Sequence, residues 1–592
     1  MSFVGRGSLH EWRPPILPDG SFLLFNGHID NRAELLSELS LPPATGDGQL
    51  YAAVFARWGS QAENRVIGQY CAATISQDCK EALLVRSPVR APPLHIWCGA
   101  NDLVVASVPR AIFATGLISP KVDDQKIADS LYLNYEEEER SWYRDISRLP
   151  IGSRATINSR SCEISRYYDV ASLAPVRFER DEDYVDQARE LLALATKSAL
   201  EPFSNPAISL SGGFDSQAVA ALALRNLVPG EVLRGYTGVP ETGWQPEDIP
   251  GRFGDEWPLV KLLSDQYPQL QIARVDAAGL SFDHKLAQIF LLAGISPFAA
   301  MNLHWMHEIW RSARAEGCDV MLTGDFGNGT FSASGEWAYS GMTSRREWAK
   351  LGRELRAISR NPVDFARNVA SKVLWPRLPN LLANAVSGLR GKPTPFESWC
   401  SLNPEWARAM NVEERSHEMG RDKHFRQIRG PLHFRRNFGG GESGDIDQVF
   451  CELHGIEHRD PTSYRPLAEF CFAIPDDQFI RKGQSRWLAR RVLKDLVPEA
   501  VRTERGRGRQ AADWSLRLAR DRPALLAELD RLARDPAMAA RFDLIGLRKD
   551  LAEWNGSSPS EARLASRLEH AIPRALTTAR FIRFVEQRND YE

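Results

Sequence analysis

One short segment, residues 208–221, constrains the fold of this chain more than any other part of its sequence. An apolar run ends at Leu210, the turn Ser211-Gly-Gly-Phe-Asp-Ser216 follows, and an Ala-rich helix is then expected. Gly212 and Gly213 carry no Cβ atoms, so the amides of the turn can come close to an anion. The two serine hydroxyls are additional donors. The pattern predicts a phosphate-binding turn between a strand and a helix.

Asp215 lies inside this turn and indicates a second ligand. A carboxylate repels a bare phosphate, so we expect Asp215 to hold a cation that bridges to the phosphate, and Mg²⁺ is the natural choice. The turn lacks the Gly-Lys-Ser/Thr of the Walker sequence. An ordinary strand–turn–helix junction is the alternative, and the combination of two glycines, an aspartate and two serines disfavours it.

Strand and helix signals alternate from this turn onward. Strands are expected near residues 207–210, 232–237, 272–275 and 320–322, with helices beginning near residues 216 and 257. This order is typical of a parallel α/β sheet with crossover helices. Residues 1–170 instead contain short apolar strands separated by turn residues, and one amphipathic helix is expected at 47–58. We therefore predict an α/β protein with two domains, 1–170 and 171–592.

A basic helical insertion is predicted at about residues 344–436. It holds about 19 Lys and Arg residues against about 9 Asp and Glu residues. The whole chain is nearly neutral, with 74 basic and 76 acidic residues and a formal charge of −2. The insertion is either a solvated helical face or a docking surface for an acidic peptide or partner.

Composition excludes several other classes of protein. The eight cysteines form no CxxC pair and no zinc-ligand spacing, so neither a disulfide scaffold nor a zinc site is expected. No signal-peptide run is present, and no stretch approaches the roughly 18 apolar residues of a spanning helix. The expectation is a cytoplasmic protein without membrane insertion. The balanced charge also disfavours nucleic acid as a partner.

The segment 211–216 resembles the pyrophosphate loop of adenylate-forming ATP pyrophosphatases, specifically the asparagine synthetase superfamily. Three further segments extend the resemblance: Phe25-Asn-Gly-His-Ile-Asp-Asn31, Leu322-Thr-Gly-Asp-Phe-Gly-Asn328 and Gly455-Ile-Glu-His-Arg-Asp-Pro461. The first is similar to the substrate loop of class II glutamine amidotransferase domains. The resemblance implies an N-terminal amidotransferase-like αββα domain and a C-terminal synthetase domain of the adenine nucleotide α-hydrolase-like type, with ATP and Mg²⁺.

One departure from the family concerns the glutaminase nucleophile. A working glutaminase domain in this family needs a cysteine at the second position, whose α-amine assists the thiolate. Here Ser2 stands at that position, and the first thiol is Cys71. Ser2 as a substitute nucleophile is the disfavoured alternative. We expect a degenerate N-terminal domain that is structural or serves docking, and a nitrogen nucleophile that is an amine of the substrate itself.

That expectation favours the branch of the superfamily that closes rings. The segments 455–463, 467–471 and 505–514 resemble proteobacterial lasso peptide cyclases, and the insertion at about 344–436 favours the same branch. The resemblance implies adenylation of an Asp or Glu side chain of a leader-cleaved precursor peptide, attack by the peptide's N-terminal amine, and release of AMP and pyrophosphate. Expected partners are a leader-peptide-binding protein and a leader peptidase. The alternatives are a β-lactam synthetase, an ammonia-dependent asparagine synthetase, and a non-catalytic ATP-binding scaffold.

The resemblance also assigns roles to single residues. ATP contacts are expected from Leu210, Ser211, Gly212, Gly213, Asp215, Ser216, Thr237, Thr323 and Gly324. Asp215 and Asn328 are the expected metal ligands, with Asn328 supplying a neutral oxygen where the family often has a carboxylate. Asp255 and Glu256 precede a helix, where an acidic residue lies near ATP or metal in the family; an N-terminal helix-dipole role is the alternative.

Catalytic roles are expected for Asp325, Glu457 and Arg507. Asp325 and Glu457 would form a pair that orients or deprotonates the attacking ammonium. Alternatively, Asp325 forms a turn or replaces the missing metal ligand, and Glu457 forms a salt bridge with Arg459 or a nearby helix. Arg507 belongs to an Arg- and Gly-rich segment, residues 505–509, that is either a mobile loop closing on triphosphate or a solvated basic loop.

Overall fold

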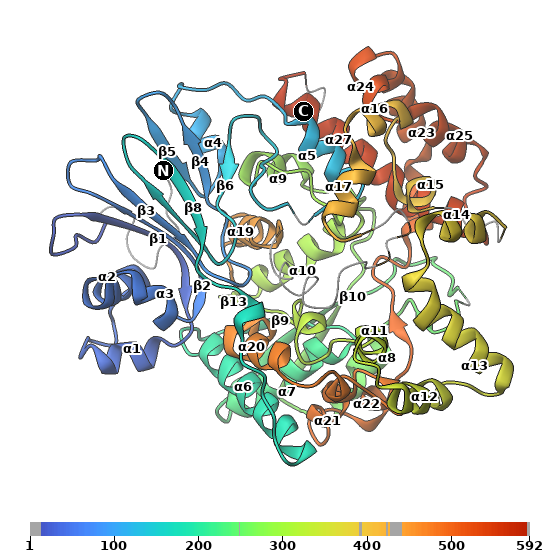
Figure 1. The fold of residues 1–592 in the computed structure, drawn as a ribbon, viewed down its shortest axis with the longest axis horizontal. Coiled ribbons are helices and arrows are strands. Elements are labelled where there is room, and N and C mark those ends of the chain that lie inside the picture. The colour runs from blue at the N-terminus through green and yellow to red at the C-terminus, as the bar shows by residue number, and fades with distance from the viewer. Residues whose placement is uncertain are drawn as a thin grey trace.

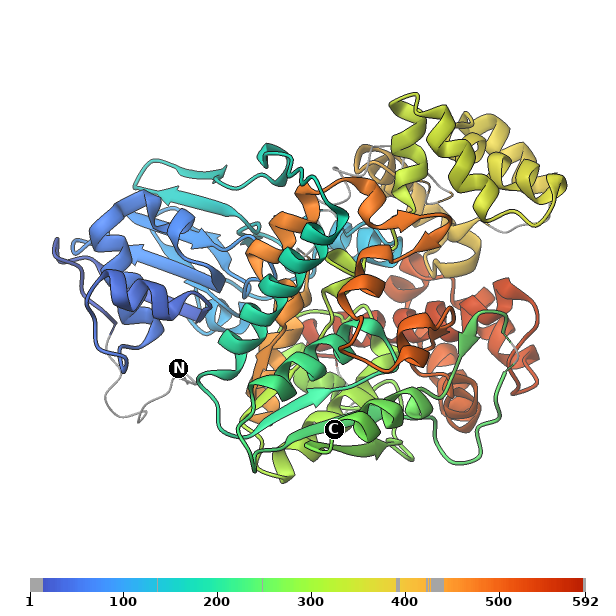
Figure 2. The same ribbon diagram turned by 90° about the horizontal axis from the view of Figure 1, so that it is seen from below.

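The computed structural model describes residues 14–135, 137–247, 249–389, 394–421, 424, 426 and 441–588. A β-rich N-terminal region, drawn in blue, lies beside a larger region of mixed helices and strands (Figures 1 and 2). Ser2 and parts of the predicted insertion, including residues 390–393 and 427–436, lie outside the described residues.

The N-terminal region contains two antiparallel sheets. The first has the order β1-β2-β3-β7-β8 and the second the order β5-β4-β6. Their strands are β1 (Phe22–Ile29), β2 (Gly68–Ile75), β3 (Ala82–Arg86), β4 (His95–Cys98), β5 (Leu103–Ala106), β6 (Ser147–Arg148), β7 (Ser153–Ile157) and β8 (Cys162–Arg166). Helix α2 (Asp47–Trp58) confirms the helix predicted at 47–58 and buries Leu50 and Val54 against the first sheet. A separate apolar layer, which includes Leu84 and Ile96, lies between the two sheets.

The C-terminal region is built on a five-stranded parallel sheet with the order β12-β10-β9-β13-β14. The strands are β9 (Pro206–Ser209), β10 (Leu233–Gly238), β12 (Leu270–Val275), β13 (Val320–Leu322) and β14 (Glu457–Arg459). The first four confirm the predicted strands, and the α/β fold class is confirmed. The chain passes outward from β9 to β10 and β12 and then returns to β13 on the other side of β9. The order therefore reverses beside β9, where ligands bind in open α/β sheets.

Helix α7 (Phe214–Asn226) follows β9 and is buried on almost every side. Its neighbours include α6 (Asp181–Leu200), which contacts it directly. Small residues such as Ala218 and Ala221 allow this close packing on the sheet. The burial fixes the amino end of α7, and with it the turn between β9 and the helix.

Much of the predicted insertion forms a helical lobe, defined here as α12 (Trp348–Ala357), α13 (Pro362–Val369) and α14 (Asn380–Leu389). The lobe projects at the edge of the molecule away from the N-terminal region (Figures 1 and 2). Within the described residues, no helix combines the length and apolar character needed to span a membrane. No disulfide joins the eight cysteines, all of which lie within the described residues.

Candidate active site

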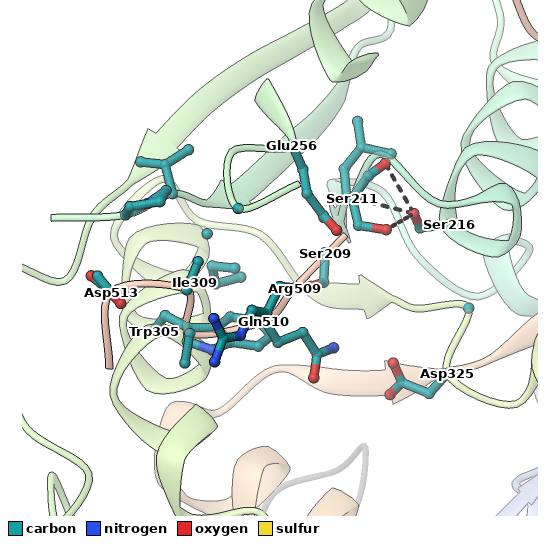
Figure 3. Close-up of a pocket in the computed structure, with 18 of the residues that line it drawn as sticks. Ser209, Ser211, Ser216, Glu256, Trp305, Ile309, Asp325, Arg509, Gln510 and Asp513 are labelled. Atoms are coloured by element: carbon teal, nitrogen blue, oxygen red, sulfur yellow. Dashed lines mark hydrogen bonds between the residues drawn. The ribbon is translucent and has the colours of Figure 1, made fainter. Parts of the chain in front are cut away.

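A cavity of about 210 Å³ lies at the carboxyl ends of β9, β10 and β13, where the strand order reverses (Figure 3). Its walls include the turn after β9, the end of β10, the loop after β13, helix α10 (Leu303–Ala315) and residues 509–513. The cavity is thus in the position that the topology favours for a nucleotide or similar ligand.

The turn after β9 is held mainly by its own hydrogen bonds. The Ser211 amide donates to Ser216 Oγ at 3.0 Å, and the two hydroxyl oxygens lie 2.9 Å apart. The Gly213 amide donates to Ser211 Oγ at 3.1 Å. A Cβ at position 212 would lie 3.0 Å from Leu259 Cδ1, so a larger residue there would require that side chain to shift. Leu210, Ser211, Asp215 and Ser216 line the cavity, as the predicted ATP contacts require.

Glu256 contributes a carboxylate to the same turn. It precedes α8 (Trp257–Gln266), but its side chain does not cap that helix. Instead, the Gly212 amide donates to Glu256 Oε2 at 3.2 Å, and Glu256 lines the cavity. Burial raises the pKa of Glu256. The geometry therefore favours the nucleotide-proximal role for Glu256 over a role in the helix dipole.

Asp215 is buried beneath the loop that follows β13. Its Oδ1 atom has no hydrogen-bond partner within the described part of the chain. A Cβ at Gly327 would lie 2.2 Å from that oxygen, and one at Gly324 would lie 2.7 Å from the Asp215 carbonyl carbon. Gly327 thus lets the second loop pack on the carboxylate, and Gly324 lets it pack on the main chain beside it. Burial raises the pKa of Asp215 to about 6, against the opposing effects of the Ser332 hydroxyl and then of the Arg486 charge.

The side-chain oxygens of Asp215 and Asn328 are suited to bind a divalent cation that also binds phosphate. The unsatisfied oxygen of Asp215 is a ligand without a partner, and Asn328 offers an amide oxygen that accepts from Arg486 Nη2 at 2.7 Å. Among the described residues, no three His, Cys, Asp or Glu side chains form a metal-binding group. Mg²⁺ is typically held by one or two protein oxygens, phosphate and water, so a sparse ligand set suits it. Asp215 and Asn328 remain the predicted ligands.

The structure does not bring the predicted pair Asp325 and Glu457 together. Asp325 follows β13 and lines the cavity with an exposed carboxylate (Figure 3). Glu457 begins β14 and lies opposite Val320, at the amino end of the parallel sheet and away from the cavity. It accepts a hydrogen bond from Arg459 Nη1 at 3.1 Å, which is the salt bridge considered as its alternative role. The prediction placed Glu457 at the wrong end of a three-residue strand.

The remaining predicted residues fall into two groups. Thr237 and Thr323 are buried beside the cavity rather than in its wall; Thr323 Oγ1 lies 3.0 Å from His458 Nε2, and Thr237 Oγ1 has no partner within the described residues. Arg507 is exposed on β17 (Arg507–Gly508), whereas Arg509 reaches the cavity. Arg509 is held by Glu247 at 2.5 Å and Glu569 at 2.7 Å. These two ion pairs therefore fix the basic segment, residues 505–509, at its Arg509 end.

Several residues of the site carried no recognisable signal in the sequence. Arg486 binds Asn328, although 158 residues separate them. Burial and, to a lesser degree, the charge of Arg507 lower the pKa of Arg486. Trp305 lines the cavity from α10, and a Cβ at Gly238 would lie 3.2 Å from its ring. The glycine at position 238, at the end of β10, is a local sequence signal that another group, here the Trp305 ring, packs closely on the strand.

Two family profiles match the chain. The asparagine synthase profile matches residues 187–542, and the glutamine amidotransferase domain profile matches residues 14–168. The chain belongs to the asparagine synthase family.

Individual relatives match smaller parts of the chain. A putative asparagine synthetase [glutamine-hydrolyzing] of Mycobacterium tuberculosis H37Rv is 29% identical over 250 residues, which are 40% of this chain and 38% of that protein. Asparagine synthetase [glutamine-hydrolyzing] 2 of Bacillus subtilis is 24% identical over 225 residues, covering 36% and 30%. The matched parts span well under half of either relative.

Among solved structures, the glutamine phosphoribosylpyrophosphate amidotransferase of Bacillus subtilis, complexed with ADP and GMP, covers 40% of this chain and 50% of its own. The two share 15% identity, with a TM-score of 0.20.

Proposed function

We propose that this chain is an ATP-dependent ligase that adenylates a carboxylate and joins it to an amine of the same peptide, as lasso peptide cyclases do. The substrate would be a leader-cleaved precursor peptide, and the products a macrolactam, AMP and pyrophosphate. The observation that carries the proposal is the phosphate-binding turn, with its buried Asp215, at the reversal point of the sheet. Family membership supports amide-bond formation as the reaction class.

The residues of the cavity divide the adenylation step among them. The amides at the amino end of α7 and the hydroxyls of Ser211 and Ser216 would bind pyrophosphate oxygens, because the first turn of a helix has N–H groups without partners in the helix. Bound Mg²⁺, held by Asp215 and Asn328, would neutralise phosphate charge and make pyrophosphate a better leaving group. Arg486, whose cation lies beside both residues, would add a second positive charge. When ATP binds, the Gly212 amide would donate to a phosphate oxygen instead of to Glu256, or Glu256 would bind the phosphate through the cation.

The amine would be received at the loop after β13. Asp325 reaches into the cavity from this loop, and its carboxylate is more than half exposed (Figure 3). A carboxylate here attracts an ammonium group and accepts its proton as the amine attacks. An α-amine has a pKa near 8, so modest help suffices. Asp325 is therefore the residue that we propose to orient and deprotonate the N-terminal amine.

The first thiol of the chain supports an internal amine rather than glutamine as the nitrogen source. Cys71 lies in β2 and is buried, and its Sγ atom donates to the Pro93 carbonyl at 3.8 Å. Burial raises the pKa of Cys71 to about 12, so the reactive thiolate is suppressed. Cys71 thus cannot take the role that the sequence leaves unfilled at Ser2.

A peptide substrate and protein partners are also part of the proposal. Four exposed arginines lie on α12 and on the residues that flank it: Arg346, Arg353, Arg356 and Arg360. Within the described residues these four form no ion pair. A face of unpaired cations suits an acidic segment of the precursor peptide or of a partner such as the leader-peptide-binding protein or the leader peptidase.

The second candidate is an ammonia-dependent asparagine synthetase. The two relatives described above are named as glutamine-hydrolyzing asparagine synthetases, which supports the synthetase reaction but not the ammonia dependence. Incubation with ATP, Mg²⁺ and a synthetic peptide with N-terminal Gly and one downstream Glu, in the presence of the co-expressed pathway proteins, tests the first candidate. Loss of one water by mass spectrometry supports ring closure. Asparagine formed from aspartate and ammonia, with the peptide unchanged, supports the second candidate instead.

A further inference from the structure

Arg90 connects the N-terminal region to the loop that carries Asp325. It lies between β3 and β4, and its side chain is only 7% exposed because it enters the C-terminal region. Its Nη2 atom donates to both carboxylate oxygens of Asp447, at 2.8 and 2.7 Å. Asp447 belongs to α19 (Ser443–His454). The guanidinium is therefore anchored on a helix of the C-terminal region.

The same guanidinium contacts the loop after β13 by two routes. Directly, Arg90 Nη2 lies 3.8 Å from Asp325 Oδ2. Indirectly, Arg90 Nη1 donates to Asp460 Oδ2 at 3.4 Å, and this oxygen also accepts from the Phe326 amide at 2.9 Å. Thr462 fixes the other Asp460 oxygen through its amide and its hydroxyl. The position of Asp325 is thus fixed by the contact of its own side chain with Arg90 and by the bond from the neighbouring Phe326 amide to Asp460.

The charges around Arg90 indicate that a cation is required here. Three carboxylates, those of Asp325, Asp447 and Asp460, converge on one cation, and Asp460 is fully buried. Carboxylates gathered in this way repel one another unless a cation lies between them. The backbone of Arg90 has φ = 45°, a left-handed conformation that is unfavourable for most residues other than glycine, so the surrounding structure holds it in place.

We propose that Arg90 is a positioning residue for amide-bond formation. By this inference the N-terminal region contributes to the reaction a guanidinium that holds Asp325 at the cavity. The inference rests on the proposed function where it assigns Asp325 to the amine. The part that concerns the loop's position is independent of that assignment and is tested separately.

Arg148 supplies a matched control variant. It is also buried in the N-terminal region, and it also pairs with α19, through Asp445 at 2.5 Å, two residues before Asp447. Among the described residues, its side-chain hydrogen bonds go to Asp445 and the Gly441 carbonyl and do not reach the loop after β13. Arg148→Met therefore removes a comparable contact between the regions while leaving the contacts of Asp325 in place.

The first measurement is hydrogen–deuterium exchange over residues 322–330 of the full-length protein. In Arg90→Met, exchange at the Phe326 amide should accelerate by about tenfold or more, because Asp460 loses its cation. Arg90→Lys should give an intermediate rate, and Arg148→Met should leave this segment unchanged. Equal exchange in Arg90→Met and wild type would overturn the proposal, as would equal acceleration in Arg148→Met. This result needs no substrate and stands even if the proposed function fails.

The second measurement separates adenylation from ring closure. Arg90→Met should keep ATP–pyrophosphate exchange within about twofold of wild type while kcat for water loss from the peptide falls by about tenfold or more. In an Asp325→Asn background, Arg90→Met should have little further effect, since the two residues act together. Equal loss in both half-reactions, or additive effects in the double variant, would show a merely structural role and overturn the proposal.

Discussion

Two neighbouring loops form the candidate site, and they are held in place in different ways. The turn after β9, residues 210–216, is fixed largely by hydrogen bonds within six residues of sequence. The loop after β13, residues 323–328, is fixed by distant residues: Arg90 and Asp460 at one end and Arg486 at the other. The first loop therefore depends on local sequence, and the second depends on the assembled fold.

The two loops meet at Asp215. Gly327 of the second loop packs on the Asp215 carboxylate and Gly324 packs on the Asp215 main chain, at distances that leave no room for a methyl group. This contact explains why Asp215 is buried and why one of its oxygens lacks a partner within the described chain. Asp215, the proposed metal ligand, is thus packed against Gly324 and Gly327 of the loop that holds Asp325, so a substitution at either glycine should be felt at Asp215.

The largest effect is expected from Asp215→Ala, which removes the central carboxylate of the turn. ATP–pyrophosphate exchange should fall by about a hundredfold or more, because the cation that neutralises phosphate charge loses its ligand. Asp265→Ala on α8, which removes an exposed carboxylate paired with Lys261, is the control and should retain full exchange. Exchange within a few-fold of wild type in Asp215→Ala would show that the turn is not the adenylation site.

Gly327→Ala tests the contact between the loops. The added Cβ would lie 2.2 Å from Asp215 Oδ1, so the carboxylate or the loop must shift. We expect exchange to fall by about tenfold or more, since displacement of a catalytic group by about 1 Å is costly. Gly352→Ala is the matched control, because a Cβ there meets nothing within 4 Å. If both variants behave alike, the loops are not coupled through this contact.

The burial of Asp215 also predicts a pH-dependent stability. Its pKa is raised to about 6, whereas an unfolded Asp has a value near 3.9, so the folded protein binds this proton more tightly. The free energy of unfolding should therefore fall as pH rises from about 4 to 6, by an amount on the order of 2–3 kcal/mol.

Asp215→Asn should abolish that particular loss of stability. Without Mg²⁺ or ATP, the variant should match wild type near pH 4 and exceed its unfolding temperature above pH 6. Thermal unfolding across this range measures the difference, with Asp265→Asn as a control for the amide substitution. A difference between Asp215→Asn and wild type that stays constant with pH would contradict the account of the buried carboxylate.

The smallest effect is expected far from both loops, on the helical lobe. Charge reversal of Arg353 and Arg356 to Glu should weaken binding of a labelled Glu-rich peptide by a few-fold, and more so at low salt, because exposed charges are screened. ATP–pyrophosphate exchange should not change. Lys197→Glu on α6 controls for a general change in net charge. Unchanged peptide affinity in the double variant would remove the lobe from the proposed docking surface.

The contrast between the loops also explains what could be predicted from the sequence. The strands around β9, the turn and helix α2 follow from local periodicity and turn chemistry, and the structure confirms them. The prediction for the position of Glu457 was wrong because the sequence alone does not give the register of a short strand against its neighbour. Glu457 pairs with Val320 at the amino end of β13, whereas Asp325 follows the carboxyl end. Arg90 and Arg486 were missed because each meets its partner across more than 150 residues of sequence.

The central claim is that carboxylate activation by adenylation precedes attack by an amine of the same peptide. The direct measurement is product stoichiometry with the synthetic Gly-to-Glu peptide, ATP, Mg²⁺ and the pathway proteins. The account predicts one AMP and one pyrophosphate for each molecule of peptide that loses one water, with no added ammonia or glutamine. Water loss accompanied by ADP and phosphate, or AMP release coupled only to asparagine formation from ammonia, would contradict it.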